Sequence, residues 1–160
     1  MNPELLRAVV GGPEKEMYWG PGDLYNFLVT GEESGGSMFA FDCLVAPGGG
    51  PPPHRHLAED ELFHMYAGSV VFTAGGETRE VKTGECLFIP KGLAHSYTNP
   101  ADTPASMLTI YSPAGMEGWF REVFDRAPDA VTTPPPPDEA MIKRMVDAGP
   151  RYNVEWVEEA

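Results

Sequence analysis

Three of the four histidines in this 160-residue sequence stand in two short blocks together with one glutamate. His54 and His56 are two residues apart, Glu61 follows five residues later, and His95 lies in the second block. Side chains at positions i and i+2 of an extended chain point to the same face, so the first two imidazoles can reach one point. Imidazole nitrogens with one carboxylate oxygen suit a divalent first-row metal. The pattern predicts one such ion per chain, and iron, nickel, manganese, cobalt, copper and zinc all remain open.

The elements that must position these residues read as short strands separated by turn formers. The sequence holds 18 glycines and 17 prolines, together with 11% aromatic residues, which indicates many turns rather than disorder. The predicted strands are 23–30, 37–46, 61–66, 69–74, 77–82, 86–89, 95–99 and 105–111. Eight strands are enough for an all-β jelly-roll barrel.

The C-terminal third differs from the strand region. Residues 116–126 carry Trp119 and Phe120 at helical spacing and predict a helix that lays an aromatic face on the barrel. The prolines at 134–137 predict an extended linker, and a terminal helix and strand are expected within 138–157. We treat 1–160 as a single domain whose barrel core spans about 23–112.

The composition argues against nucleic acid and membrane partners and leaves a small molecule as the expected binding partner. The formal net charge is −13, so the surface field repels nucleic acid and anionic lipid. No apolar stretch approaches a membrane span, which predicts a cytoplasmic protein without a membrane partner. Cys43 and Cys86 both lie in apolar runs, where a buried, inert thiol is expected.

Both histidine blocks resemble the two sequence motifs of the cupin family. The first block, GGGPPPHRHLAEDE at 48–61, closes at Gly68. The second block carries Gly84, Pro90, Gly92, His95 and Asn99 at the motif's spacing, about 15 residues further on. The resemblance implies a double-stranded β-helix, a metal near one mouth of the barrel held by His54, His56, Glu61 and His95, and a homodimer.

Within the family, the sequence is most similar to single-domain cupins of the quercetin-dioxygenase-like group, through PPPH at 51–54, EDELF at 59–63 and SPAGME at 112–117. The resemblance favours a dioxygenase acting on a phenolic or enolic, flavonol-like substrate. Two alternatives remain open. One is a polyketide cyclase or isomerase that uses the metal as a Lewis acid, and the other is a metal-holding binding module without turnover.

Roles for the remaining residues follow from strand parity. Glu61 is the predicted proton acceptor, and Tyr97, which has the parity of His95, is a second catalytic candidate. Phe63 and Met65 share the parity of Glu61 and are predicted to form a substrate wall beside the Trp119 and Phe120 lid. His64 is expected to point away from the metal. Glu59 and Asp60 are expected to be solvated charges.

Overall fold

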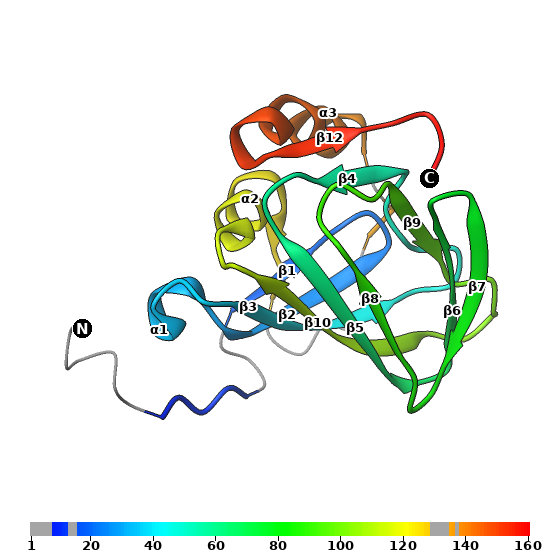
Figure 1. Ribbon diagram of the computed structural model, residues 1–160, viewed down its shortest axis with the longest axis horizontal. Coiled ribbons are helices and arrows are strands. Elements are labelled where there is room, and N and C mark those ends of the chain that lie inside the picture. The colour runs from blue at the N-terminus through cyan, green and yellow to red at the C-terminus, as the bar shows by residue number, and fades with distance from the viewer. Residues whose placement is uncertain (1–7, 13–15, 129–134, 137) are drawn as a thin grey trace.

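The computed structural model describes residues 8–12, 16–128, 135–136 and 138–160. In this part of the chain the strands form two antiparallel sheets, and the helices α2 (Met116–Val123) and α3 (Glu139–Ala148) lie at one end of them (Figure 1). The predicted all-β jelly roll with short C-terminal helices is confirmed.

The larger sheet has seven strands in the order β11-β1-β2-β3-β10-β5-β8. In chain order they are β1 (Met17–Trp19), β2 (Asp23–Val29), β3 (Phe39–Val45), β5 (Asp60–Ala67), β8 (Cys86–Ile89), β10 (Ala105–Ser112) and β11 (Asp125–Arg126). Burial alternates along β10, where Ala105, Met107, Thr109 and Tyr111 are buried and their neighbours are not. This period of two fixes which face of the sheet meets the core.

The smaller sheet has five strands in the order β12-β4-β9-β6-β7. They are β4 (His54–His56), β6 (Ser69–Ala74), β7 (Glu77–Lys82), β9 (His95–Thr98) and β12 (Val154–Trp156). Gly75 and Gly76 join β6 to β7 with φ angles of 58° and 81°, values that favour glycine and that match the twist of a tight hairpin.

Aromatic packing joins the two sheets into one core. Phe63 of β5 and Phe72 of β6 belong to different sheets, and their ring centroids are 4.9 Å apart. Phe120 of α2 packs edge-on against Phe39 of β3, with centroids 5.6 Å apart. Helix α2 therefore covers the barrel with its aromatic face, as its spacing predicts.

The helical segments have identifiable ends. The short helix α1 (Gly31–Ser34) has a capping box in which Thr30 and Glu33 bond each other's backbone N–H. The side chain of Asp138 caps α3 by accepting from the Met141 N–H at 2.7 Å. A 3-10 helix (Gly149–Tyr152) then leads into β12. No helix of the described residues is long and apolar enough to span a bilayer.

All eight predicted barrel strands are present, as is the terminal strand expected within 138–157, which is β12, and the structure adds β1, β4 and β11. The predicted helix 116–126 ends at Val123, because Phe124 is extended and 125–126 pair with β1 instead. The proline segment 134–137 lies partly outside the described residues. One expectation was wrong: Cys86 is exposed, whereas Cys43 is buried. Cys86 lies on β8, the edge strand of the larger sheet, and edge strands bury fewer side chains.

Candidate metal centre

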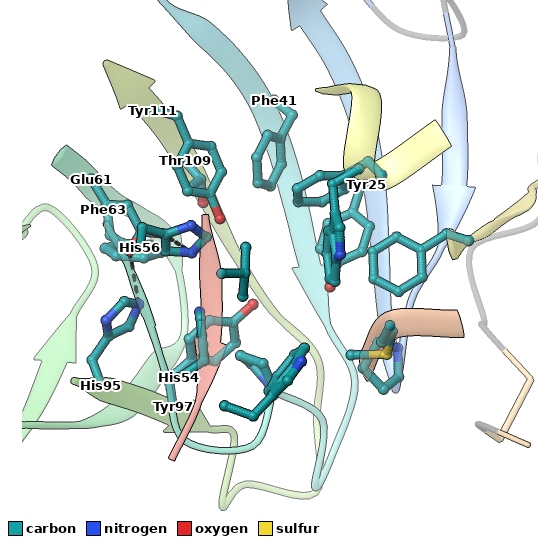
Figure 2. Close-up of a pocket in the computed structure, with 18 residues that line it drawn as sticks. Tyr25, Phe41, His54, His56, Glu61, Phe63, His95, Tyr97, Thr109 and Tyr111 are labelled. Atoms are coloured by element: carbon teal, nitrogen blue, oxygen red, sulfur yellow. Dashed lines mark ion pairs between the residues drawn. The ribbon is translucent and has the colours of Figure 1, made fainter. Parts of the chain in front are cut away.

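Three histidines meet inside the barrel near the end that the helices cover. His54 and His56 come from β4 and His95 from β9, and the register places His54 directly opposite His95. One ring nitrogen of each lies within 4.8 Å of the others (Figure 2). All three side chains are buried, at 6%, 3% and 1% exposure. Buried imidazoles at this spacing form a candidate metal site.

A tight turn before β4 sets the direction of this strand. Gly50 has a φ of 129°, and a Cβ there would lie 2.0 Å from the carbonyl oxygen of Tyr97 on β9. Only glycine allows this approach, so the residue is required where the loop passes β9. The segment GGGPPP at 48–53 therefore brings His54 against His95.

Backbone carbonyls orient two of the imidazoles. His54 Nδ1 lies 3.0 Å from the carbonyl oxygen of Pro52, and His95 Nδ1 lies 3.0 Å from that of Leu93. A carbonyl only accepts, so Nδ1 carries a proton in each ring. Nε2 of His95 faces a Glu61 oxygen at 2.8 Å and donates to it, whereas Nε2 of His54 keeps its lone pair. This is the tautomer that a metal requires at Nε2.

Glu61 of β5 faces the other two histidines. Its Oε2 lies 2.8 Å from His95 Nε2, and its Oε1 lies 3.7 Å from His56 Nε2 (Figure 2). Burial raises the pKa of Glu61, but the charges of His56 and His95 and the hydrogen bond to His95 lower it more, to about 2. The glutamate is therefore an anion at neutral pH.

Burial acts on the histidines in the opposite direction. It lowers the pKa of His54 to about 3, and the nearby His95 and His56 add to the shift. Burial also lowers the pKa of His56. Burial also lowers the pKa of His95, but the negative charge of Glu61 and the hydrogen bond to it raise it more, so the net shift is upward. A metal would displace the proton that His95 shares with Glu61, since the groups bind metal as neutral imidazoles and a carboxylate.

The residues present fit a divalent transition ion. Both ring nitrogens of His56 are buried and have no hydrogen-bond partner. Nε2 of His95 is also buried, and its one partner among the described residues is Glu61, with which it forms an ion pair. Buried polar atoms are rarely left unpaired, because this costs about 1 to 3 kcal/mol each. A metal at this point would satisfy them.

Glu59 is a further residue of this centre, which the sequence argument had placed in solvent. It is 5% exposed, and its Oε2 lies 3.8 Å from His56 Nδ1. Burial raises the pKa of Glu59 to about 7. The signal was available, since Glu59 has the same strand parity as Glu61. Asp60 points the other way and accepts from the Lys91 N–H at 2.9 Å.

A pocket opens beside the histidines, and its other walls are mostly aromatic. The lining residues are Pro21, Tyr25, Phe41, Pro51, His54, His56, Glu61, Phe63, His95, Tyr97, Thr109, Tyr111, Trp119, Phe120, Phe124, Met145, Val154 and Trp156. None of these described residues is a lysine or an arginine. The cavity volume is about 40 Å³, room for a few water molecules.

The residues predicted to line the substrate pocket divide into two groups. Phe63, Trp119 and Phe120 line it, whereas Met65 is fully buried in the core and is not among the lining residues. Tyr97 also lines the pocket, but its hydroxyl donates to Asp23 Oδ2 at 2.8 Å. Asp23 is fully buried and gave no signal in the sequence beyond its place at the start of a strand.

His64 lies apart from the cluster. Its Nδ1 is 3.1 Å from the Cys86 sulfur, directly across from it on β8. Both side chains are on the opposite face of the sheet from Glu61, as the parity of β5 requires.

A jelly-roll barrel with a histidine cluster near one end is the architecture of a cupin. The family described as "Cupin domain" matches residues 41–111. That span contains both histidine blocks, so this part of the chain matches the cupin domain in sequence as well as in fold.

Similarity to individual proteins is local. Germin-like protein 5-1 of Oryza sativa subsp. japonica is 32% identical over 102 residues, which are 59% of this chain and 45% of that protein. The tetracenomycin polyketide synthase protein TcmJ of Streptomyces glaucescens is 30% identical over 77 residues, 48% of this chain and 52% of TcmJ. The structure of KdgF from Halomonas sp. has a TM-score of 0.61 at 15% identity and covers 70% of this chain and 99% of KdgF.

The chain spans about half, or less, of the length of the curated relatives it matches. The KdgF likeness shows the fold alone. The finer likeness to quercetin dioxygenases stays a prediction.

Proposed function

We propose that this protein is a metal-dependent dioxygenase that acts on a small phenolic or enolic compound. The observation that carries the proposal is the convergence of His54, His56 and His95 within 4.8 Å, with Glu61 against two of them, inside an aromatic pocket. We assign the three histidines and Glu61 as the metal ligands. A redox-capable ion bound there would supply electron transfer between a substrate oxygen and dioxygen.

The protein's own groups prepare the substrate. Glu61 is ionised at neutral pH and can accept the proton of a substrate hydroxyl. The phenol of Tyr111, which bonds to Glu61, has a pKa raised by burial and so remains a donor that holds the carboxylate in place. The aromatic walls exclude water from the reacting atoms.

Pocket chemistry supports an uncharged aromatic or enolic substrate. Lysine and arginine are missing from the described lining, so a phosphate or a dicarboxylate has no cationic side chain to bind. Rings and tyrosine hydroxyls instead match a flat molecule with one or two oxygens. The cavity volume of about 40 Å³ favours a substrate no larger than one ring over a three-ring flavonol.

A second candidate is a non-redox reaction, in which the ion polarises a carbonyl during cyclisation or isomerisation. It is favoured by the similarity to TcmJ, whose name places it with a polyketide synthase. The same walls would suit a polyketide fragment, and Glu61 would again accept the proton. A binding module without turnover is the remaining alternative.

Oxygen uptake separates these functions. Protein loaded in turn with iron, nickel, cobalt, manganese, copper or zinc is mixed with single-ring phenols and enols, and dioxygen is followed with an electrode. We expect uptake in step with substrate loss for at least one redox-capable ion and none with zinc. His54→Ala, treated identically, is the control for free metal. Conversion under nitrogen with zinc would instead establish the non-redox reaction, and tight binding without conversion the binding module.

A further inference from the structure

Asp23, the first residue of β2, is a buried acid behind the pocket wall. It is 0% exposed, and the described side chains that bond it are two tyrosines. Tyr97 donates to its Oδ2 at 2.8 Å and Tyr25 at 3.1 Å. Oδ1 is buried and has no hydrogen-bond partner. A buried carboxyl without a cation costs free energy, so its retention calls for a role.

The two tyrosines belong to the pocket, whereas Asp23 does not. Tyr25 and Tyr97 line the cavity, and their hydroxyl ends point toward one another in Figure 2. Each phenol has one hydroxyl proton, and each uses it to donate a hydrogen bond to Asp23. The two oxygens are therefore left with lone pairs, which accept hydrogen bonds but cannot donate them.

This arrangement does not depend on the charge of Asp23. Burial raises the pKa of Asp23 to about 7 against the two tyrosine hydrogen bonds, so both forms occur near neutrality. A proton on the carboxyl belongs on Oδ1, the oxygen that no donor reaches, and Oδ2 continues to accept from both tyrosines. Burial also raises the pKa of both phenols, which stay protonated.

Cys43 does not compete for these protons. Its sulfur is 3.8 Å from the Tyr97 hydroxyl, which is a long contact, and burial raises the pKa of the thiol. A protonated thiol is a weak acceptor beside a carboxyl oxygen.

We propose that Asp23 is a positioning residue that fixes Tyr25 and Tyr97 as hydrogen-bond acceptors and thereby makes the pocket select ligands carrying a free hydroxyl. The inference takes its substrate class, single-ring phenols, from the proposed function. It does not depend on which reaction the protein catalyses. A ligand without the donor leaves a tyrosine oxygen unpaired in a dry pocket, which costs affinity.

Catechol and 2-fluorophenol test this selection. Each has one hydroxyl that can bind the ion, and at the neighbouring position fluorine is close in size to the second hydroxyl of catechol but cannot donate. Their dissociation constants are measured by calorimetry on zinc-loaded protein without dioxygen, so turnover plays no part. We expect wild-type protein to bind catechol about tenfold more tightly. In Asp23→Asn the side-chain amide donates to one tyrosine oxygen, and we expect the preference to fall below about threefold.

Two further variants complete the design. Asp42→Asn makes the same chemical change on β3, at a residue outside the pocket, and should keep the tenfold preference. Tyr97→Phe keeps the ring and removes one acceptor, so catechol affinity should fall to that of 2-fluorophenol even if Asp23→Asn does not fold.

Equal binding of the two ligands by wild-type protein would overturn the proposal. So would an equal loss of affinity for both ligands in Asp23→Asn, since that is the mark of a merely structural role. Failure of wild-type protein to bind catechol at all would overturn both this inference and the substrate class. A preserved preference without oxygen uptake would support the inference and count against the dioxygenase alone.

Discussion

His54 and His95 share a local arrangement, in which each ring donates from Nδ1 to the carbonyl two residues earlier in the chain. The two carbonyls thus orient both rings before any ligand binds. His56 has no such partner, and its nearest carboxylates are those of Glu59 and Glu61, at 3.8 and 3.7 Å. Preorganised donors of this kind raise metal affinity, because little is lost in ordering them.

Removal of one imidazole should therefore empty the site. We expect about one divalent ion per wild-type chain, and a loss of at least tenfold in occupancy for His54→Ala, His56→Ala or His95→Ala after gel filtration. Elemental analysis gives the ratio. His64→Ala is the matched control, since His64 bonds Cys86 on the opposite face and should keep the metal. Full occupancy in His95→Ala would show that the ligand set is wrong.

Some residues of the site could be predicted from the sequence, and others could not. Spacing and parity were enough to select the histidines and Glu61, because alternate residues of one strand point to the same face of the sheet. Asp23 and Tyr97 are 74 positions apart and meet only when β2 and β9 pack in the barrel. No local pattern encodes that contact, so the buried acid behind Tyr97 could not be predicted.

At the scale of elements, β12 closes the site from the far end of the chain. It pairs antiparallel with β4, and Trp156 lies opposite His54. The two rings are 5.6 Å apart by their centroids, and Trp156 lines the pocket. The sequence predicted a strand here, but its partner is about 100 residues away and was not predicted.

Trp156 should set the size of ligand that the pocket accepts. Trp156→Ala removes a wall and leaves the backbone pairing of β12 intact, so a two-ring phenol such as 2-naphthol should gain about tenfold in affinity relative to phenol. Calorimetry on zinc-loaded protein measures the ratio. Phe88→Ala changes an aromatic residue that is 59% exposed on β8, outside this pocket, and should leave the ratio unchanged. An unchanged ratio in Trp156→Ala would mean that the limit on size lies elsewhere.

At the scale of the whole molecule, turn residues made the barrel predictable. Glycines and prolines divide the sequence into short apolar runs, and hairpins such as β6 with β7 follow from their turn alone. Pairings between distant segments, such as β1 with β11, left no comparable signal. The helix α2 was placed correctly but ended early, because strand pairing at 125–126 overrides helical spacing.

The free energy of unfolding should depend on pH through the buried carboxyl of Asp23. The groups that face it are Tyr25 on its own strand, Tyr97 on β9 and Cys43 on β3, none of which is a cation. Burial raises the pKa of Asp23 from 3.8 to about 7. Between these two values the folded protein holds a proton that the unfolded chain has released, so stability falls as pH rises through this window and levels off above pH of about 7.

Asp23→Asn removes this one titration and leaves the others in place. From about pH 5.5 to about pH 8, we expect the wild-type protein to lose about 2 kcal/mol of unfolding free energy relative to the variant. Urea denaturation of both proteins at the two pH values gives the difference, and the remaining titrations cancel between them. A difference that stays constant with pH would mean that Asp23 is ionised throughout. In that case the charged carboxylate alone holds Tyr25 and Tyr97 as acceptors. The hydroxyl preference of the pocket should be independent of pH in either case, because Oδ2 accepts from both tyrosines whether or not Asp23 is protonated.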